Sequence, residues 1–216
     1  MSGHLNANLI AHCYDDNERH ALEECARREH IDRQVSVFVF PAGRCVLAIQ
    51  FASLGAHVTV GDLPAHQREA ENRALARGVE DNITFLPCTL SELPLELPGA
   101  PYDIIVLRRG LVRLPYRRAR DMLRQLLLSL KIGGKLYVSI LGLHSELGND
   151  YPGRDLPIEQ RFTHLSPAMA AKYDISDPVC LYSERNLFML LLEAGASVLR
   201  TQTTTYGNVK GIGVRV

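Results

Sequence analysis

The sequence lacks an excess of charge of either sign, because 24 lysines and arginines balance 24 aspartates and glutamates over 216 residues. A net charge of zero argues against a protein dedicated to nucleic acid or to a membrane surface, since either would need a strong basic field. Cysteine is also sparse, with five residues that show neither CxxC spacing nor the density of a disulfide framework. A reducing cytoplasm is therefore the expected location.

Long apolar runs and several well-known motifs are missing as well. No stretch approaches the ~18 apolar residues of a transmembrane helix, and the polar start MSGHLNANL lacks the regions of a secretory signal. The P-loop pattern GxxxxGK[ST], the dinucleotide pattern GxGxxG and the hydrolase pattern GxSxG are all absent. The histidines show no metal-ligand spacing with cysteine or acid. The sequence thus predicts no membrane partner and no metal.

What the sequence does contain is an alternation of strands and helices that begins at Val35–Asp62. Val35–Phe40 is apolar on both faces, which is typical of a central strand covered by helices on either side. A helix is predicted over Arg44–Leu54, and a second strand then ends at Asp62. Open α/β sheets bind their ligands at the carboxyl ends of parallel strands. Asp62 is therefore a candidate ligand-binding residue.

The same alternation continues along the chain and predicts one fold class. We expect an α/β, Rossmann-like three-layer sandwich, with a mainly parallel seven-stranded sheet and a C-terminal antiparallel hairpin. Residues 1–33 are predicted to form an N-terminal helical segment, with a charged, solvated helix at 17–29, and 34–216 one domain. Within that domain, 142–180 is an irregular insertion over the ligand crevice. The other predicted helices are 64–78, 116–130 and 184–194, and the other strands are 82–86, 104–107, 135–141, 197–205 and 209–216.

Several segments carry a resemblance to one family: GAHVTVGDL, YDIIVLRRGLVRLP, LKIGGKLYVSI and YSERNLFMLLLEAG. Over residues 34–216 the chain resembles the class I S-adenosylmethionine-dependent methyltransferases. It is most similar to small bacterial members that carry GLHSELGNDYP-like text after the fifth strand and GNVK-like text near the end. The resemblance implies S-adenosylmethionine as cofactor and methyl transfer to an unidentified small molecule or macromolecule.

The resemblance also implies a cofactor site, although its motif is eroded in this chain. In the family, an acid in the first strand and a GxGxG turn pass under the cofactor, an acid ends the second strand, and another follows the third. Here Val37 stands for the first acid, Val39 and Pro41 replace two glycines, and Cys88 with Thr89 replaces the last acid. Valine and proline cannot supply the close backbone approach of glycine. The implied cofactor-binding residues are Pro41, Ala42, Gly43, Asp62, Leu63, Thr89, Leu90 and Arg108.

Two interpretations of this eroded motif stay open. In the first, the cofactor still binds, because methyl transfer needs mainly the correct placement of a nucleophile and few protein groups. In the second, the cofactor is lost and the chain is a non-catalytic methyltransferase-fold protein, acting as a binding module or as the partner of an active paralogue. Whether Phe38, Phe40 and Pro41 fill the crevice would discriminate between them.

Two further groups of residues are candidates for chemistry. His144, Glu146 and Tyr151 could form a catalytic site, with His144 as general base and Glu146 as its orienting partner. An exposed loop histidine is the plainer interpretation. Seven arginines between Arg108 and Arg124 could bind phosphate or an acidic partner. A solvated helix face is the plainer interpretation there, because the arginines oppose a leucine stripe.

Overall fold

The computed structural model describes residues 15–32, 34–93 and 97–216 of the chain. The first fourteen residues of the predicted N-terminal segment therefore lie outside the described residues. The chain forms two compact units, each described below by itself. The first unit is the chain up to Leu107 together with Ser129–Tyr137, and the second is Arg108–Leu128 together with Val138–Val216.

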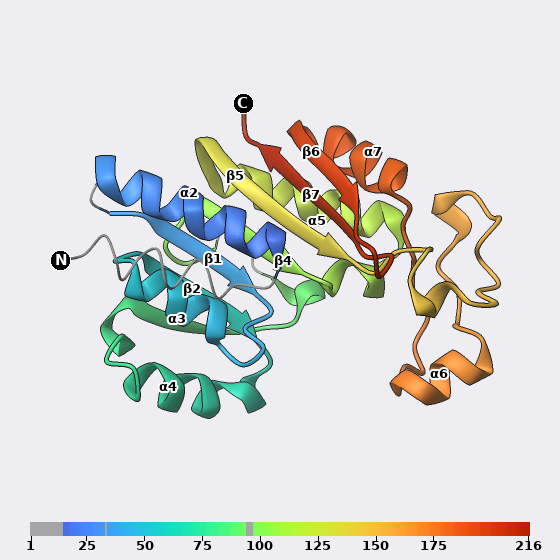
Figure 1. Ribbon diagram of the computed structural model, residues 1–216, viewed down its shortest axis with the longest axis horizontal. Coiled ribbons are helices and arrows are strands. Elements are labelled where there is room, and N and C mark those ends of the chain that lie inside the picture. The colour runs from blue at the N-terminus through green and yellow to red at the C-terminus, as the bar shows by residue number, and fades with distance from the viewer. Residues whose placement is uncertain (1–14, 33, 94–96) are drawn as a thin grey trace. The chain divides into compact units, whose positions relative to one another are not determined.

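The seven predicted strands are present and form one sheet with the order β3-β2-β1-β4-β5-β7-β6. Strand β1 lies between β2 and β4 and is parallel to both, whereas β6 and β7 are antiparallel. Figure 1 shows β1 to β4 as neighbouring arrows. The predicted fold class is confirmed. The strands are β1 Ser36–Phe40, β2 His57–Asp62, β3 Ile83–Pro87, β4 Tyr102–Arg108, β5 Leu130–Ile140, β6 Ser197–Thr203 and β7 Val209–Val214.

Strand β1 is central because both of its faces are apolar. The last four of its residues are buried, as are the last five of β2. The two strands run in register, with Val39 opposite Val60, so that both end at the same edge of the sheet.

Strand β5 starts earlier than predicted, because the Gly133-Gly134 pair lies inside it. A side chain at Gly134 would come within 2.8 Å of the Lys131 carbonyl oxygen, so this glycine lets the strand continue.

The helices of the first unit are α2 Asp16–Asp32, α3 Val46–Ser53 and α4 Gln67–Leu75, with 3-10 turns η1 Pro64–His66, η2 Glu80–Asn82 and η3 Leu90–Glu92. Helix α3 begins two residues later than predicted, because Arg44 and Cys45 belong to the turn after β1. Among the described residues, no helix has the length and hydropathy needed to cross a membrane.

The prediction that the first helix is merely solvated is wrong, because α2 carries a buried acid. The Glu24 carboxylate accepts hydrogen bonds from Arg28 at 2.7 Å and Lys135 at 2.9 Å, and also from Arg27. Arg28 also donates to Asp103, which binds Lys131 at 2.7 Å. Burial opposes the charged form of Glu24, but these hydrogen bonds win and lower its pKa to about 2. This network holds α2 at the amino end of the sheet.

The helices of the second unit follow the predicted pattern. In α5 Tyr116–Leu128, Leu123, Leu126 and Leu127 are buried, whereas the arginines at 117, 118 and 124 are exposed. Helix α7 Glu184–Ala194 starts at a capping box between Ser183 and Asn186 and ends at Gly195 in a left-handed conformation. The remaining helices are η4 Gly110–Arg113, η5 Glu146–Gly148, η6 Ile158–Gln160 and α6 Pro167–Tyr173.

The predicted insertion at 142–180 has a small core of its own. Leu147, Tyr151, Leu165 and Val179 are buried in one apolar cluster. Beside it, the buried Arg161 guanidinium donates to the carbonyl oxygens of residues 153, 156 and 181 and to the side chain of Asn186. These contacts replace the regular backbone ladder that the segment lacks. Its lack of periodicity therefore reflects short elements, with order supplied by side chains.

Candidate functional site

The turn after β1 folds back onto β2. The Ala42 N–H donates to the Gly61 carbonyl at 3.0 Å, and the Cys45 N–H donates to the Ala42 carbonyl at 2.9 Å. Gly43 has φ of +54°, a left-handed conformation that glycine adopts without steric cost. It is also exposed. The one glycine that survives in this turn is thus at a position that favours glycine, although Cys45 in the same turn adopts φ of +57°.

Asp62 lies beside this turn at the carboxyl end of β2, with its side chain buried. Its Oδ2 accepts the Gly43 N–H at 3.0 Å, and its Oδ1 accepts the Leu63 N–H at 2.7 Å. The His66 Nδ1 lies 2.9 Å from the same Oδ1 and donates to it, because an ionised carboxylate only accepts. The predicted residues Gly43, Asp62 and Leu63 are therefore brought together. Sequence reasoning missed His66, although its spacing of four residues from Asp62 was a readable signal.

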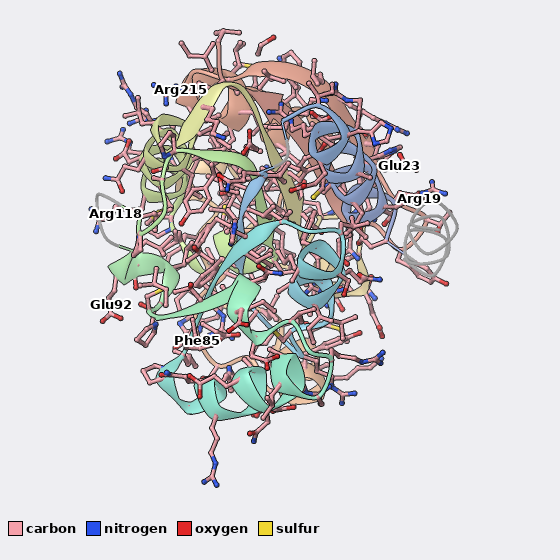
Figure 2. The ribbon with its side chains drawn as sticks, turned by 90° about the vertical axis from the view of Figure 1, so that its left-hand side faces the viewer. Arg19, Glu23, Phe85, Glu92, Arg118 and Arg215 are labelled. Carbon is pink, nitrogen blue, oxygen red and sulfur yellow. The ribbon has the colours of Figure 1, made fainter. Side chains whose placement is uncertain are left out.

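The end of β3 lies next to the same acid. The Cys88 N–H donates to the Asp62 carbonyl at 2.8 Å. Burial, and then the negative charges of Asp62 and Glu92, raise the pKa of the Cys88 thiol to about 11. The predicted Thr89 donates its hydroxyl to the Glu92 carboxylate at 2.7 Å, while Leu90 is buried. Figure 2 shows the Glu92 side chain at the surface. An acid does follow the third strand, three residues later than the sequence comparison placed it.

The aromatic side chains of β1 pack sideways onto β2. A side chain at Gly61 would meet the Phe40 ring at 2.8 Å, the Phe38 ring at 3.2 Å and the Cys88 sulfur at 3.3 Å. Both rings are buried, and Phe38 also lies against the Tyr102 ring at 5.7 Å. Gly61 therefore makes room for the two phenylalanines. With the rings packed there, Gly43 and Leu63 remain exposed at this edge.

The other predicted cofactor residues have different surroundings. Pro41 is half-buried and Ala42 is buried within the turn. Arg108 ends β4 and belongs to the second unit. Its neighbour Arg109 adopts φ of +59° and donates its N–H to the Ser139 carbonyl at 2.6 Å.

The structure does not join the three catalytic candidates. Glu146 is exposed and its carboxylate accepts hydrogen bonds from Lys172 and Tyr173, so both of its oxygens are engaged away from His144. Tyr151 is buried, and its hydroxyl lies against backbone carbonyl oxygens, including that of Val179 at 2.6 Å. This tyrosine holds the insertion together. The exposed imidazole of His144 is left as the one candidate general base of the three.

The two motif-like segments around Gly142 and Gly207 come together in the second unit. A side chain at Gly207 would lie 2.1 Å from the backbone of His144, and one at Gly142 would lie 2.0 Å from the Gly207 carbonyl oxygen. A real side-chain carbon does not come so close to another atom, so both positions accept only glycine. The segments are more than sixty residues apart in the sequence, yet their backbones touch beside His144.

Comparison with known proteins finds similarity in structure. No family model matches the chain, and no curated protein matches it in sequence. A methyltransferase of Methanosarcina mazei, described as dependent on S-adenosylmethionine, superimposes with a TM-score of 0.65 at 20% identity, over 88% of this chain and 96% of its own. The fold is that of the S-adenosylmethionine-dependent methyltransferases.

Other methyltransferases with this fold are longer. The mitomycin 7-O-methyltransferase MmcR aligns with 97% of this chain at 15% identity and a TM-score of 0.60, but only 60% of MmcR is covered. PigF, solved with S-adenosylhomocysteine, aligns with 88% of this chain at 16% identity and a TM-score of 0.57, and 53% of PigF is covered. This chain thus spans little more than half the length of these relatives. The methyltransferase fold predicted from the sequence is confirmed.

Proposed function

We propose that this chain binds S-adenosylmethionine at the carboxyl ends of β1 to β3 and transfers its methyl group to an acceptor. The observation that carries the proposal is the buried Asp62 carboxylate beside the exposed Gly43 turn, on a methyltransferase fold. Ligands of open α/β sheets bind at this edge. The presence of S-adenosylhomocysteine in PigF supports the choice of cofactor.

The residues of the first unit fit the adenosine part of this cofactor. Asp62 accepts the ribose hydroxyls, and Leu63, with 45% of its surface exposed, offers an apolar face to the adenine ring. Gly43 allows close approach of the turn. Glu92, held by Thr89, supplies the carboxylate that receives the adenine amino group. Pro41, Ala42 and Leu90 complete the proposed contacts within this unit. Arg108, in the second unit, stays a predicted cofactor residue.

The amino acid end of the cofactor has fewer polar partners in this chain than the adenosine part. Val37 stands where the family resemblance places an acid, and its side chain is buried in β1. A lost hydrogen bond to a charged group costs about 1.5 to 3 kcal/mol. We therefore expect affinity in the micromolar range or weaker, with the adenosine part providing most of it.

The bound cofactor supplies a methyl group on a positively charged sulfur, which is electrophilic without protein assistance. The protein has to place an acceptor in line with that methyl group and, for a hydroxyl acceptor, remove its proton. His144, in the second unit, is the exposed member of the three catalytic candidates and is proposed as the general base. The acceptor is a small molecule or a macromolecule.

Four buried cysteines that are free thiols support the proposal of a reducing cytoplasm.

Calorimetric titration with S-adenosylmethionine and S-adenosylhomocysteine tests this function. We expect micromolar binding to the wild-type protein and at least tenfold weaker binding to Asp62→Ala. Glu71→Ala is the matched control, because Glu71 is an exposed acid on α4 of the same unit and should leave affinity unchanged. Absence of heat at millimolar ligand would refute cofactor binding and leave the alternative, a non-catalytic binding module or partner of an active paralogue.

A further inference from the structure

The hydrogen bonds of Asp62 leave too little room for a ribose. A carboxylate offers about four acceptor sites on its two oxygens. Oδ1 already accepts the Leu63 N–H and the His66 Nδ1, and Oδ2 accepts the Gly43 N–H. One site therefore remains, whereas two ribose hydroxyls that both donate to Asp62 need two. One of the three present donors has to leave before the diol can bind.

Two of these donors are fixed by the backbone. The Leu63 N–H follows directly after Asp62 in the chain, so it moves only with the end of β2. The Gly43 N–H is held because the neighbouring Ala42 N–H is bonded to the Gly61 carbonyl at 3.0 Å. Moving the Gly43 N–H would shift the turn after β1, and moving the Leu63 N–H would shift the end of β2.

The third donor is a side chain that is free to rotate. His66 ends the three-residue turn η1, and 49% of its side chain is exposed. Rotation about its two side-chain torsions carries the imidazole into water without moving the backbone. The ring then loses one hydrogen bond to the protein and regains it from solvent. His66 is therefore the donor whose departure costs least.

We propose that His66 is a placeholder in the cofactor site: its imidazole occupies a ribose-binding position on Asp62 and is displaced when the cofactor enters. The inference rests on the proposed function and adds a residue that sets affinity. In the free protein the imidazole satisfies a buried carboxylate, and on binding the ribose takes over that role. His66 thus competes with the cofactor for Asp62 and lowers its affinity, whereas Gly43 and Asp62 contribute to binding.

The test measures affinity for S-adenosylhomocysteine by calorimetry in the wild type, His66→Ala and a control, His57→Ala. His57 is exposed at the start of β2, the strand that Asp62 ends. Its removal therefore also deletes an imidazole but leaves the contact with Asp62 in place. We expect His66→Ala to bind about three- to tenfold more tightly, because a competing hydrogen bond is gone. The His57→Ala affinity should equal that of the wild type.

A second readout follows the ring itself. Nitrogen NMR of the His66 imidazole should show a hydrogen-bonded Nδ1 in the free protein and a change at that nitrogen when S-adenosylhomocysteine is added to saturation. Wild-type binding that His66→Ala leaves unchanged or weakens would overturn the placeholder role while leaving the proposed function intact. No binding by the wild type or by His66→Ala would overturn both.

Discussion

The two ends of the parallel strands in the first unit each bury carboxylates, but they satisfy them differently. At the amino end, Glu24 and Asp103 are held by arginine and lysine side chains. At the carboxyl end, Asp62 is held by two backbone N–H groups and one half-exposed imidazole. A buried acid paired with fixed cations is a structural link, whereas one paired with an exchangeable donor is suited to a ligand.

The largest expected effect comes from breaking the amino end. Asp103→Ala removes the acceptor of Lys131 and of the Ser36 N–H, and it leaves Arg28 with only its bonds to Glu24 and to the Gly133 carbonyl. Loss of one member of a buried charge network costs about 4 kcal/mol of unfolding free energy. Urea denaturation measures it, with the exposed Asp81→Ala as control. A loss below about 1 kcal/mol would mean that the network is not structural.

Acidification should weaken the same end. The pKa of Glu24 is about 2 in the folded protein against 4.5 for the free side chain. A lowered folded pKa gives stability that is fully present above pH ~4.5 and is lost as the pH falls toward 2. That loss is about 3 kcal/mol, with each pKa unit contributing about 1.4 kcal/mol. Urea denaturation between pH 6 and 2 measures it, and Glu24→Gln should flatten the curve. An unchanged slope in Glu24→Gln would contradict the assignment.

Asp62→Asn should affect cofactor binding more than stability, the opposite of what we expect for Asp103→Ala. The amide oxygen still accepts one of the backbone N–H groups, so we expect the unfolding free energy to fall by only about 1 to 2 kcal/mol. Affinity for S-adenosylhomocysteine should fall at least tenfold, whereas Asp103→Ala should leave it unchanged in the folded protein. A stability loss as large as that of Asp103→Ala, without an effect on binding, would make the two ends alike.

The smallest effect concerns the thiol beside Asp62. With the pKa of Cys88 raised to about 11, roughly one thiol in a thousand is ionised at pH 8. Alkylation by iodoacetamide, followed by mass spectrometry of the Cys88 peptide, should therefore be slow. Asp62→Asn removes one of the negative charges that raise this pKa and should speed the reaction a few-fold. An equal or slower rate would show that burial alone controls this thiol.

The sequence by itself determined the order of the elements and the fold. The two apolar faces of Val35–Phe40 predicted a central parallel strand, and Ser183 with Gly195 marked the ends of α7. These features are local: side-chain periodicity and capping depend on residues a few positions apart. Asp62 was recognisable for the same reason, because it directly ends a strand.

Only the tertiary structure decided which polar groups meet. It buried Glu24 on a helix that looked solvated, and it engaged Glu146 with Lys172 and Tyr173. It also brought Gly142 against Gly207. Each contact joins residues far apart in the chain, and their pairing depends on how the elements pack. The packing decides which buried groups form hydrogen bonds, and the periodicity of the sequence does not predict it.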